Sequence, residues 1–481
     1  MKKLFYIPVI AVLVFASACG KYLDIQPNDK FLEEQVYQSE LGIKSVLNGI
    51  YMRMMKEFSY GGAMTMADVE YLGQQFMADA NHAFNTYPGY QYADDKTKGR
   101  MNKIWSESYV TILNINKFLE GLNRYPGVVP VARERIMRGE AYGLRAMHHF
   151  DMLRLFGPMY STVDSINLSI PYYSNGTAKT TPILPANAVM DSVLRDIDLA
   201  LSYLAEDPIK NMGKTNILTN EAISDADVDG LRQLHFNYNA ALVLKARVLL
   251  YRGNKAEAYQ LAKDAITEVL KFNYWVQATN IIGITGATDK VFSTEIVFGV
   301  YNQQMVQAYQ RYYDPELTDN NILLKNDTRL TSTTFEGLIN DYRLKALWMV
   351  PSSGAKASRT FFKYAGLTDK TLVRGYVVPM LRMSELFYIV AETTTDKTEA
   401  LTYLNTVRQN RGIDALGANA TVETELRKEY QKEFIGEGQL FFYYKRKGTT
   451  PIVNATTGAN VTMNKSTYVV PLPESETNVR N

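Results

Sequence analysis

The chain has 481 residues, and its 52 Lys and Arg side chains nearly balance its 50 Asp and Glu. This balance, without a long basic run, argues against nucleic-acid binding. The length is enough for a large core in one extended or two compact domains. The unusual count is 33 tyrosines. Because tyrosine has a flat apolar face and a hydrogen-bonding tip, that count fits both wet binding surfaces and packed helix interfaces.

The first residues predict a targeting segment. Two lysines precede an apolar run over residues 4–15, which has the length of a signal peptide and is shorter than the ~20 residues of a membrane span. Residues 16–20 read Ala-Ser-Ala-Cys-Gly, and Cys19 is the only cysteine. They resemble a bacterial lipoprotein box, although Ala16 stands where leucine is usual. Residues 1–18 would then be a lipoprotein signal peptide and Cys19 a lipid-bearing N-terminus. An ordinary Ala-x-Ala cleavage site is the alternative.

The next part of the chain alternates helical and irregular segments. Residues 33–56 have apolar side chains at helical spacing, and so do residues 101–122. Between them, residues 58–99 lose this periodicity and are rich in Gly, Asn, Asp and Tyr. Long loops of this kind are usually functional or disordered.

Residues 138–160 predict a buried helix, because apolar side chains lie on both of its sides. Small residues such as Gly139 and Gly143 would let neighbouring helices approach closely. Gly157 and Pro158 end the helix, since proline has no N–H to donate and restricts the residue before it. The pattern predicts a helix packed between others in a stack.

Helix pairs follow further along the chain. Residues 188–204 are amphipathic, and residues 236–251 and 255–270 predict two helices joined by a tight turn. Residues 381–392 and 398–410 repeat this arrangement. A helix, a short turn and a helix with small residues at the crossing resemble a tetratricopeptide unit. The scaffold is therefore predicted to be a degenerate helical repeat.

Strand-like runs interrupt the helices at 295–301 and 376–379. We expect mostly loop and minor strand over 302–370, including the tyrosine-rich stretch 307–315. The last long helix is predicted at 421–435. The predicted fold class is mainly α, with helix pairs as a scaffold, long irregular loops and a few short strands.

Several stretches together resemble the SusD/RagB family of nutrient-binding outer-membrane lipoproteins of Bacteroidetes, in the order in which that family has them. They are residues 22–27, 140–157, 382–392, 400–408, 429–446 and 470–476. The best-marked one reads Glu-Ala-x-x-Leu-Arg-Ala from Glu140, then aromatic residues before Phe156 and Gly157. Pro158 departs from the family pattern, in which the proline stands a little later.

The resemblance implies a binding protein and not an enzyme, with no cofactor. Such proteins cover a SusC-like TonB-dependent transporter and capture glycans, or in some members peptides, for import. It also implies a lipid anchor in the outer membrane and a position facing the exterior. Residues 19–310 and 311–481 would be the N-terminal and C-terminal regions of one compact unit.

A sugar ring offers an apolar face of C–H groups and a rim of hydroxyls, so a binder stacks aromatic rings on it and places polar groups at its edge. The candidates are tyrosines of the two irregular segments, with Asn, Asp and Arg as rim partners: Tyr87, Tyr90, Tyr92, Tyr309, Tyr312, Tyr313, Asn81, Asp94 and Arg311. The alternative for each tyrosine is packing on the scaffold.

Other patterns favour structural roles. His148 and His149 point about 100° apart on a helix and cannot easily share one metal ion, so we interpret them as core or interface residues. Asp94 and Asp95, or the glutamates of 423–437, could supply the two carboxyls that glycoside hydrolysis needs about 5 to 10 Å apart. We interpret the glutamates as a capped, solvated helix face.

Three function classes thus stay open at this point: a surface binding lipoprotein, a lipid-anchored glycoside-active enzyme, and a structural scaffold. Glu140 and Arg145, inside the buried helix, are predicted to pair structurally, since buried charges need partners. We favour the hypothesis of a binding protein, and we prefer a glycan over a peptide as its ligand.

Overall fold

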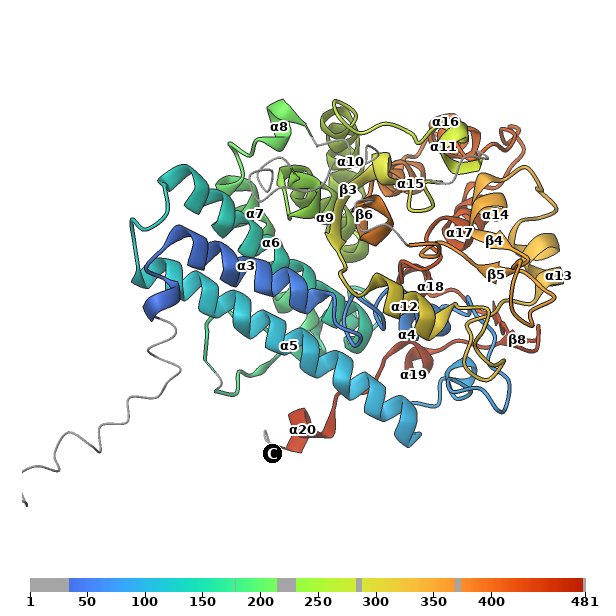
Figure 1. Ribbon diagram of the computed structural model, residues 1–481, viewed down its shortest axis with the longest axis horizontal. Coiled ribbons are helices and arrows are strands. Elements are labelled where there is room, and N and C mark those ends of the chain that lie inside the picture. Colours follow the sequence, from blue (N-terminus) through green and yellow to red (C-terminus); the bar gives the residue numbers. More distant parts are fainter. Residues whose placement is uncertain (1–33, 178, 214–230, 283–287, 368–372, 479–481) are drawn as a thin grey trace, which may run out of the picture.

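The computed structural model describes residues 34–177, 179–213, 231–282, 288–367 and 373–478. Cys19 and the predicted signal peptide lie outside these ranges. Figure 1 shows the N-terminal helices side by side on one side of the molecule and the C-terminal elements on the other, with an antiparallel strand pair between them. The fold is mainly α-helical with short strands, as the sequence predicts. Among the described helices, none has the length and apolar character needed to cross a membrane.

Long helices form the N-terminal half. They are α3 (Glu40–Met54), α5 (Asp95–Arg124), α6 (Val131–Phe156) and α7 (Ala186–Tyr203), with the short elements α4 (Asp68–Leu72), η1 (Tyr87–Gly89), η2 (Asp164–Ile166) and α8 (Ile209–Met212). Strand β1 (Leu168–Pro171) pairs antiparallel with β2 (Ile183–Pro185). Helix α5 begins earlier than predicted because Asp94 caps it, accepting from the backbone N–H groups of Lys96 at 3.0 Å and Thr97 at 3.3 Å. Asp94, a predicted rim partner, is thus a helix cap.

Helix α6 is the buried centre of this half, as predicted. A Cβ atom at Gly143 would lie 2.0 Å from the ring of Phe236, so only glycine allows this contact. The buried charges of α6 are paired, but with residues of other elements. Arg145 donates to both carboxylate oxygens of Asp196 in α7, at 2.6 and 2.7 Å. These partners compensate the cost of burying the charge.

The predicted helix pairs are confirmed. Helix α9 (Tyr238–Arg252) ends at Gly253, whose left-handed conformation (φ 93°) turns the chain into α10 (Lys255–Val269). The second pair is α15 (Met383–Thr393) and α16 (Lys397–Gln409), and α10 packs on both α9 and α15. Arg247 of α9 donates to both oxygens of Glu385 of α15 at 2.6 Å each, which links the two pairs.

The strand pair at the centre of Figure 1 consists of β3 (Ile296–Tyr301) and β6 (Val377–Arg382). The other short pairs are β4 (Trp348–Met349) with β5 (Thr360–Phe361) and β7 (Ile452–Val453) with β8 (Asn460–Val461). Pairing of β3 with β6 joins stretches about eighty positions apart. The two strand-like runs of the sequence are therefore neighbours.

The remaining elements are short, except for one helix of twelve residues. They are η4 (Arg232–Leu234), α11 (Ala278–Ile282), η5 (Ser293–Glu295), α12 (Met305–Tyr312), α13 (Asp327–Arg329), η6 (Leu330–Thr334), α14 (Tyr342–Leu347), η7 (Val373–Tyr376), α17 (Val422–Glu433), α18 (Leu440–Lys447), α19 (Lys465–Tyr468) and α20 (Glu474–Thr477). The tyrosine-rich stretch 307–315, predicted as loop, is largely helix α12.

The glutamates of α17 were predicted as a solvated face, and this prediction is wrong for its last turns. Glu429 and Glu433 are buried, and Glu437 beyond the helix end is buried too. Arg382 donates to Glu433 at 2.5 Å and to Glu437 at 3.0 Å. Burial is tolerated because arginines from distant elements neutralise these carboxylates.

The two adjacent histidines of α6 are core residues, as predicted. His148 and His149 are 1% and 0% exposed. Burial lowers the pKa of His148 to about 4 and that of His149 to about 3, so both are neutral at pH 7. Within the described ranges, no group of three or more His, Cys, Asp or Glu side chains could hold a metal ion.

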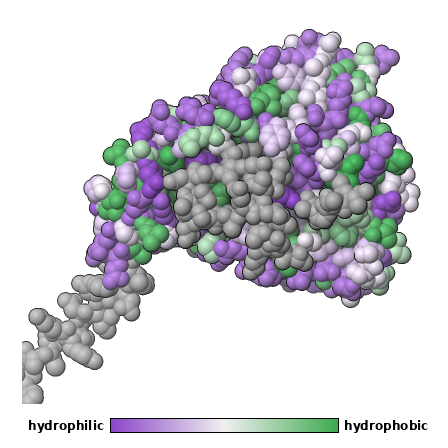
Figure 2. Space-filling model, turned by 45° about the horizontal axis from the view of Figure 1, so that its top comes forward, coloured by the Kyte–Doolittle hydropathy of each residue, from purple (hydrophilic) through white to green (hydrophobic). Residues whose placement is uncertain are grey.

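The surface mixes polar and apolar residues. Figure 2 shows hydrophobic and hydrophilic residues interspersed over the coloured part of one face. Several large apolar side chains are exposed, among them Met52 at 60%. Single exposed apolar side chains are ordinary on soluble proteins, but Met52 faces a hollow.

Candidate functional site

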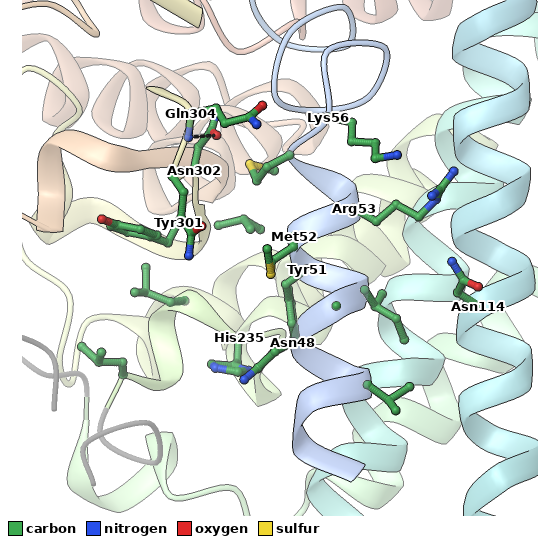
Figure 3. A pocket seen from close by; sticks show the side chains of 18 of the residues that line it. Asn48, Tyr51, Met52, Arg53, Lys56, Asn114, His235, Tyr301, Asn302 and Gln304 are labelled. Atoms are coloured by element: carbon green, nitrogen blue, oxygen red, sulfur yellow. Dashed lines mark hydrogen bonds between the residues drawn. The ribbon is translucent and has the colours of Figure 1, made fainter. Parts of the chain in front are cut away.

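A large open cleft lies between α3 and the end of β3. Its volume is about 960 Å³, at the upper end of the ~300–1,000 Å³ typical of ligand pockets. Figure 3 shows side chains from both walls pointing into it. We call it the α3–β3 cleft, lined mainly by Val46, Asn48, Tyr51, Met52, Arg53, Met55, Lys56, Asn114, Lys117, Leu231, Leu234, His235, Val300, Tyr301, Asn302, Gln303 and Gln304.

Helix α3 forms one wall because its two faces differ. Ser39 caps it, its hydroxyl accepting from the Gly42 N–H at 3.1 Å. The inner face buries Ile43, Leu47 and Ile50. Asn48 and Met52, four positions apart, lie on the exposed face of α3 and line the cleft, and Lys56 lines it from just beyond the end of the helix. This wall offers an amide, a thioether and a cation to a ligand.

The chain leaving β3 forms the opposite wall. The half-buried ring of Tyr301 lies 5.6 Å from that of Tyr376, tilted by 30°. The Asn302 backbone N–H donates to the Tyr376 carbonyl at 2.7 Å, and its side-chain oxygen accepts from the Gln304 N–H at 2.9 Å. The Asn302 side-chain NH₂ is buried and has no partner among the described residues. Buried amides are normally hydrogen-bonded, so this donor is available to a ligand oxygen.

A buried charge cluster supports the floor of the cleft. The Glu140 carboxylate accepts from the Tyr51 hydroxyl at 2.6 Å and from His235 Nδ1 at 3.0 Å, and it is paired with Arg232. Burial alone would raise the pKa of Glu140, but the Arg232 charge, together with the interactions with His235 and Tyr51, outweighs it and lowers this pKa to about 2. The cluster therefore holds Tyr51 and His235 in fixed positions.

The rim of the cleft carries positive charge. Arg53 is paired with Glu107 at 2.8 Å, outside the lining, and Lys56 and Lys117 are exposed. The lining residues in the described part of the chain include no carboxylate. Glycoside hydrolysis uses two carboxyl groups facing the sugar, and these walls do not provide that pair. What they offer is an aromatic ring, several amides and an apolar floor.

The tyrosines predicted in the first irregular segment are buried. Tyr87, Tyr90 and Tyr92 are 1%, 7% and 8% exposed. Their hydroxyls donate into the protein: Tyr87 to a carboxylate of α4, Tyr90 to the Leu72 carbonyl at 2.9 Å and Tyr92 to the Thr467 carbonyl at 2.7 Å. In this arrangement the rings pack on the scaffold and expose little surface, and contact of these three tyrosines with a ligand stays a prediction.

The tyrosines of the second segment lie on and just after α12. Tyr312 and Tyr313 are 2% and 0% exposed, and the Tyr313 hydroxyl donates to the Met66 carbonyl at 2.5 Å. Tyr309, one turn earlier, is only half-buried. The helix face does not explain this difference, because residues four positions apart lie on the same face. The ring of Tyr313 is covered by those of Phe76 and Phe361, whose centroids lie 5.8 and 5.1 Å away.

The structure nevertheless brings the two irregular segments together, and we call the region where they meet the loop junction. The Met77 N–H donates to the Leu324 carbonyl at 2.8 Å, and the Ala83 N–H donates to the Asn320 carbonyl at 2.9 Å. The predicted residues that keep exposed surface near this junction are Asn81, Tyr309 and Arg311, the last paired with Glu57 at 3.1 Å. Contact of these three with a ligand stays a prediction.

The residues of the cleft were not among the sequence candidates. A signal for them exists in the run Tyr-Asn-Gln-Gln at 301–304, which follows a buried strand. An aromatic residue with three amides at the end of a strand is a suitable group for binding hydroxyls. The sequence does not indicate that this run faces α3.

Two family comparisons cover most of the chain. Residues 21–250 match a family described as starch-binding and associating with the outer membrane. Residues 299–480 match the SusD family. No curated protein matches the chain significantly.

Solved structures show the same fold. A SusD superfamily protein from Bacteroides thetaiotaomicron has a TM-score of 0.71 at 20% identity, over 92% of this chain and 98% of that one. A putative sugar binding protein from Bacteroides vulgatus reaches 0.69 at 20% identity, over 92% and 96%. Surface glycan-binding protein A from Bacteroides uniformis reaches 0.66 at 16% identity, over 92% and 98%. These structures show the shared fold, and the two family matches, over residues 21–250 and 299–480, identify the chain as a member of the SusD family.

Proposed function

We propose that this protein is a cell-surface lipoprotein that captures an oligosaccharide and delivers it to a SusC-like TonB-dependent transporter in the outer membrane. The observation that carries the proposal is the side-chain NH₂ of Asn302, which has no partner among the described residues, beside the Tyr301 ring in a cleft of about 960 Å³. A ring and a hydrogen-bond donor at one wall match the two kinds of surface of a sugar.

The comparisons support a glycan as ligand. Two of the structures with this fold are described as a putative sugar binding protein and a surface glycan-binding protein. The exposed residues near the loop junction, Asn81, Tyr309 and Arg311, extend the proposal to a second contact region. A peptide is the alternative ligand, because the apolar side chains of the cleft, such as Met52, would also accept its side chains.

The location at the outer membrane rests on Cys19 and on family membership. If Cys19 carries lipid, the protein will fractionate with outer membranes, and Cys19→Ala will release it to the soluble fraction. A Cys19→Ala protein that stays with the membranes in high salt would contradict the anchor. Copurification of a TonB-dependent transporter with the wild-type protein from detergent-solubilised outer membranes tests the partner.

The decisive experiment measures binding and turnover in the same samples. The chain from Gly20 onward, which lacks the lipid-bearing Cys19, is titrated by calorimetry with a panel of oligosaccharides, polysaccharides and peptides. We expect saturable binding to a glycan with no new reducing ends. New reducing ends would favour the glycoside-active enzyme, and saturable binding to peptides alone would favour the peptide-binding alternative.

Variants locate the site. Tyr301→Ala removes the half-buried ring at the end of β3 and should weaken glycan binding about tenfold. This change lies in the upper part of the free-energy range for aromatic contacts. Tyr274→Ala is the matched control, since Tyr274 is 47% exposed and lies outside the cleft. Equal affinities of the two variants would place the ligand elsewhere, with the loop junction as the next region to test through Tyr309→Ala.

A further inference from the structure

A second hollow lies on the other side of α5. Its volume is about 280 Å³, and its walls come from α5, from residues 173–177 and from α20. We call it the aromatic pocket, because Trp105, Tyr109 and Tyr173 line it. It is smaller than the ~300–1,000 Å³ of most ligand pockets. Its size suits one small ring and not a chain of several.

The aromatic pocket is separate from the α3–β3 cleft. Helix α5 contributes Trp105 to the pocket and Asn114 to the cleft. These residues are nine positions apart, about two and a half turns, so they point to opposite faces of the helix. A ligand in one hollow therefore cannot touch the other hollow directly.

Three rings form the apolar wall. The centroids of Trp105 and Tyr109 are 4.5 Å apart, and those of Tyr109 and Tyr173 are 5.6 Å apart at a steep angle of 74°. Tyr109 and Tyr173 are half-buried, so parts of their faces are open. Rings set at an angle make a corner in which a flat, C–H-bearing ring can rest.

The indole N–H of Trp105 adds a hydrogen-bond donor to the lining residues. Trp105 is 3% exposed, and its N–H has no hydrogen-bond partner among the described residues. A buried indole N–H usually finds an acceptor. A hydroxyl of a ligand in the pocket would supply the acceptor that the described residues do not.

Polar side chains surround the rings. Asn102 and Ser106 of α5 stand one turn apart at one edge, and Asn175 stands at another. Helix α20 brings Ser475 and Glu476 to the opposite edge. This edge is held in place, because the preceding Glu474 is paired with Lys98 of α5. Amides, hydroxyls and one carboxylate around an apolar face match the hydroxyl rim of a sugar.

We propose that the aromatic pocket is a second carbohydrate site, which accepts a single pyranose ring of a neutral sugar. The ring would rest its C–H face on Tyr173 and Tyr109, and one hydroxyl would accept from the Trp105 N–H. Neutral sugars are favoured over acidic ones, because the described lining includes no Lys or Arg to pair with a sugar carboxylate. The site does not depend on what the cleft binds, so it goes beyond the proposed function.

Trp105 itself reports on occupancy. The sequence has three tryptophans, at 105, 275 and 348, so Trp275→Phe with Trp348→Phe in the chain from Gly20 leaves Trp105 as the only indole. Titration with glucose, galactose, mannose and xylose should change its emission saturably for at least one sugar, with a dissociation constant of about 1 mM for so few contacts. Glucuronate and galacturonate should bind at least tenfold more weakly.

Matched variants separate a binding role from a structural one. Tyr173→Ala should abolish saturation and Tyr173→Phe should keep it, while Tyr301→Ala in the cleft should leave it unchanged. If the tryptophan replacements unfold the chain, saturation-transfer NMR on the wild-type chain from Gly20 gives the same readout. No saturable response to any neutral sugar, or a response unchanged by Tyr173→Ala, would overturn the proposal and leave the cleft proposal untouched.

Discussion

Arg411 and Glu295 form a two-pronged ion pair in the interior of the protein. The two guanidinium nitrogens lie 2.8 and 2.6 Å from the two carboxylate oxygens, and both side chains are fully buried. The same guanidinium donates to Glu433 at 2.6 and 3.0 Å. Glu295 directly precedes β3 and Glu433 ends α17. The pair therefore fixes the strand that leads into the cleft against the C-terminal helices.

Removal of this arginine should destabilise the fold strongly. Arg411→Met leaves two buried carboxylates with less compensation, and breaking such a pair costs about 3–5 kcal/mol. Urea denaturation, monitored by circular dichroism, measures the change in the free energy of unfolding. Lys271→Ala is the control, because Lys271 and Glu268 form a 2.7 Å pair at the exposed end of α10, where such pairs contribute roughly 0.2–1 kcal/mol. Equal losses in the two variants would contradict a structural role for the buried pair.

Acid should destabilise the protein through α6. Burial lowers the pKa of His148 to about 4, below its ordinary value of 6.5. As the pH falls from 6.5 toward 4, the unfolded chain takes up this proton before the folded protein does, so stability is lost in that window. At pH 5 the loss for this one group is about 2 kcal/mol.

His148→Gln tests the assignment by comparison with the wild type. Between pH 7 and pH 5, the variant should lose about 2 kcal/mol less unfolding free energy than the wild type. His149 and other groups contribute the loss that the variant still shows. Denaturation curves at both pH values give the two differences. Parallel pH dependences of the two proteins would show that His148 does not titrate in this way.

Two glycines should respond in opposite directions to the same change. A Cβ at Gly143 would lie 2.0 Å from the Phe236 ring, and Gly143→Ala should cost about 3 kcal/mol by overpacking. Gly99, in α5, has no neighbouring atom within 4 Å of such a Cβ. Gly99→Ala should instead stabilise the helix by about 0.5–1 kcal/mol. Thermal denaturation of both variants measures the two signs, and a destabilised Gly99→Ala would contradict the open environment.

The helix pairs could be predicted because their signals are local. Small residues, helical spacing and a turn glycine such as Gly253 lie within one stretch of sequence. The burial of Glu433 could not be predicted in this way. Its partners Arg382 and Arg411 come from other elements, and a run of glutamates on one helix has the same appearance whether it faces water or arginines. Nonlocal pairing of charge decides between the two.

The candidate site shows the same limit. The two irregular segments were predicted as functional regions, and the structure joins them, but packing decides which of their tyrosines are exposed. Tyr313 lies one turn after Tyr309, yet one side chain is fully buried and the other is not. The α3–β3 cleft joins α3, α5 and the end of β3, which are far apart in the sequence. Periodicity within one segment does not report such a meeting.

These two tyrosines provide the last prediction. Tyr313→Phe removes a buried hydroxyl that donates to the Met66 carbonyl at 2.5 Å and should cost about 1 kcal/mol of unfolding free energy. Because the ring is covered, glycan affinity should not change. Tyr309→Ala removes a half-exposed ring near the loop junction. It should weaken glycan binding about threefold to tenfold if that ring contacts the sugar, as the sequence predicts.

Calorimetric titration and urea denaturation of both variants distinguish the two roles. A variant of a scaffold tyrosine changes stability and leaves affinity alone, whereas a variant of a contact tyrosine lowers affinity at equal stability. Tyr274→Ala, which removes a 47% exposed ring outside the cleft, serves as the control for loss of an exposed ring. If Tyr313→Phe lowered affinity without loss of stability, the buried tyrosines would have to become exposed when ligand binds, and the loop junction would open in the bound state.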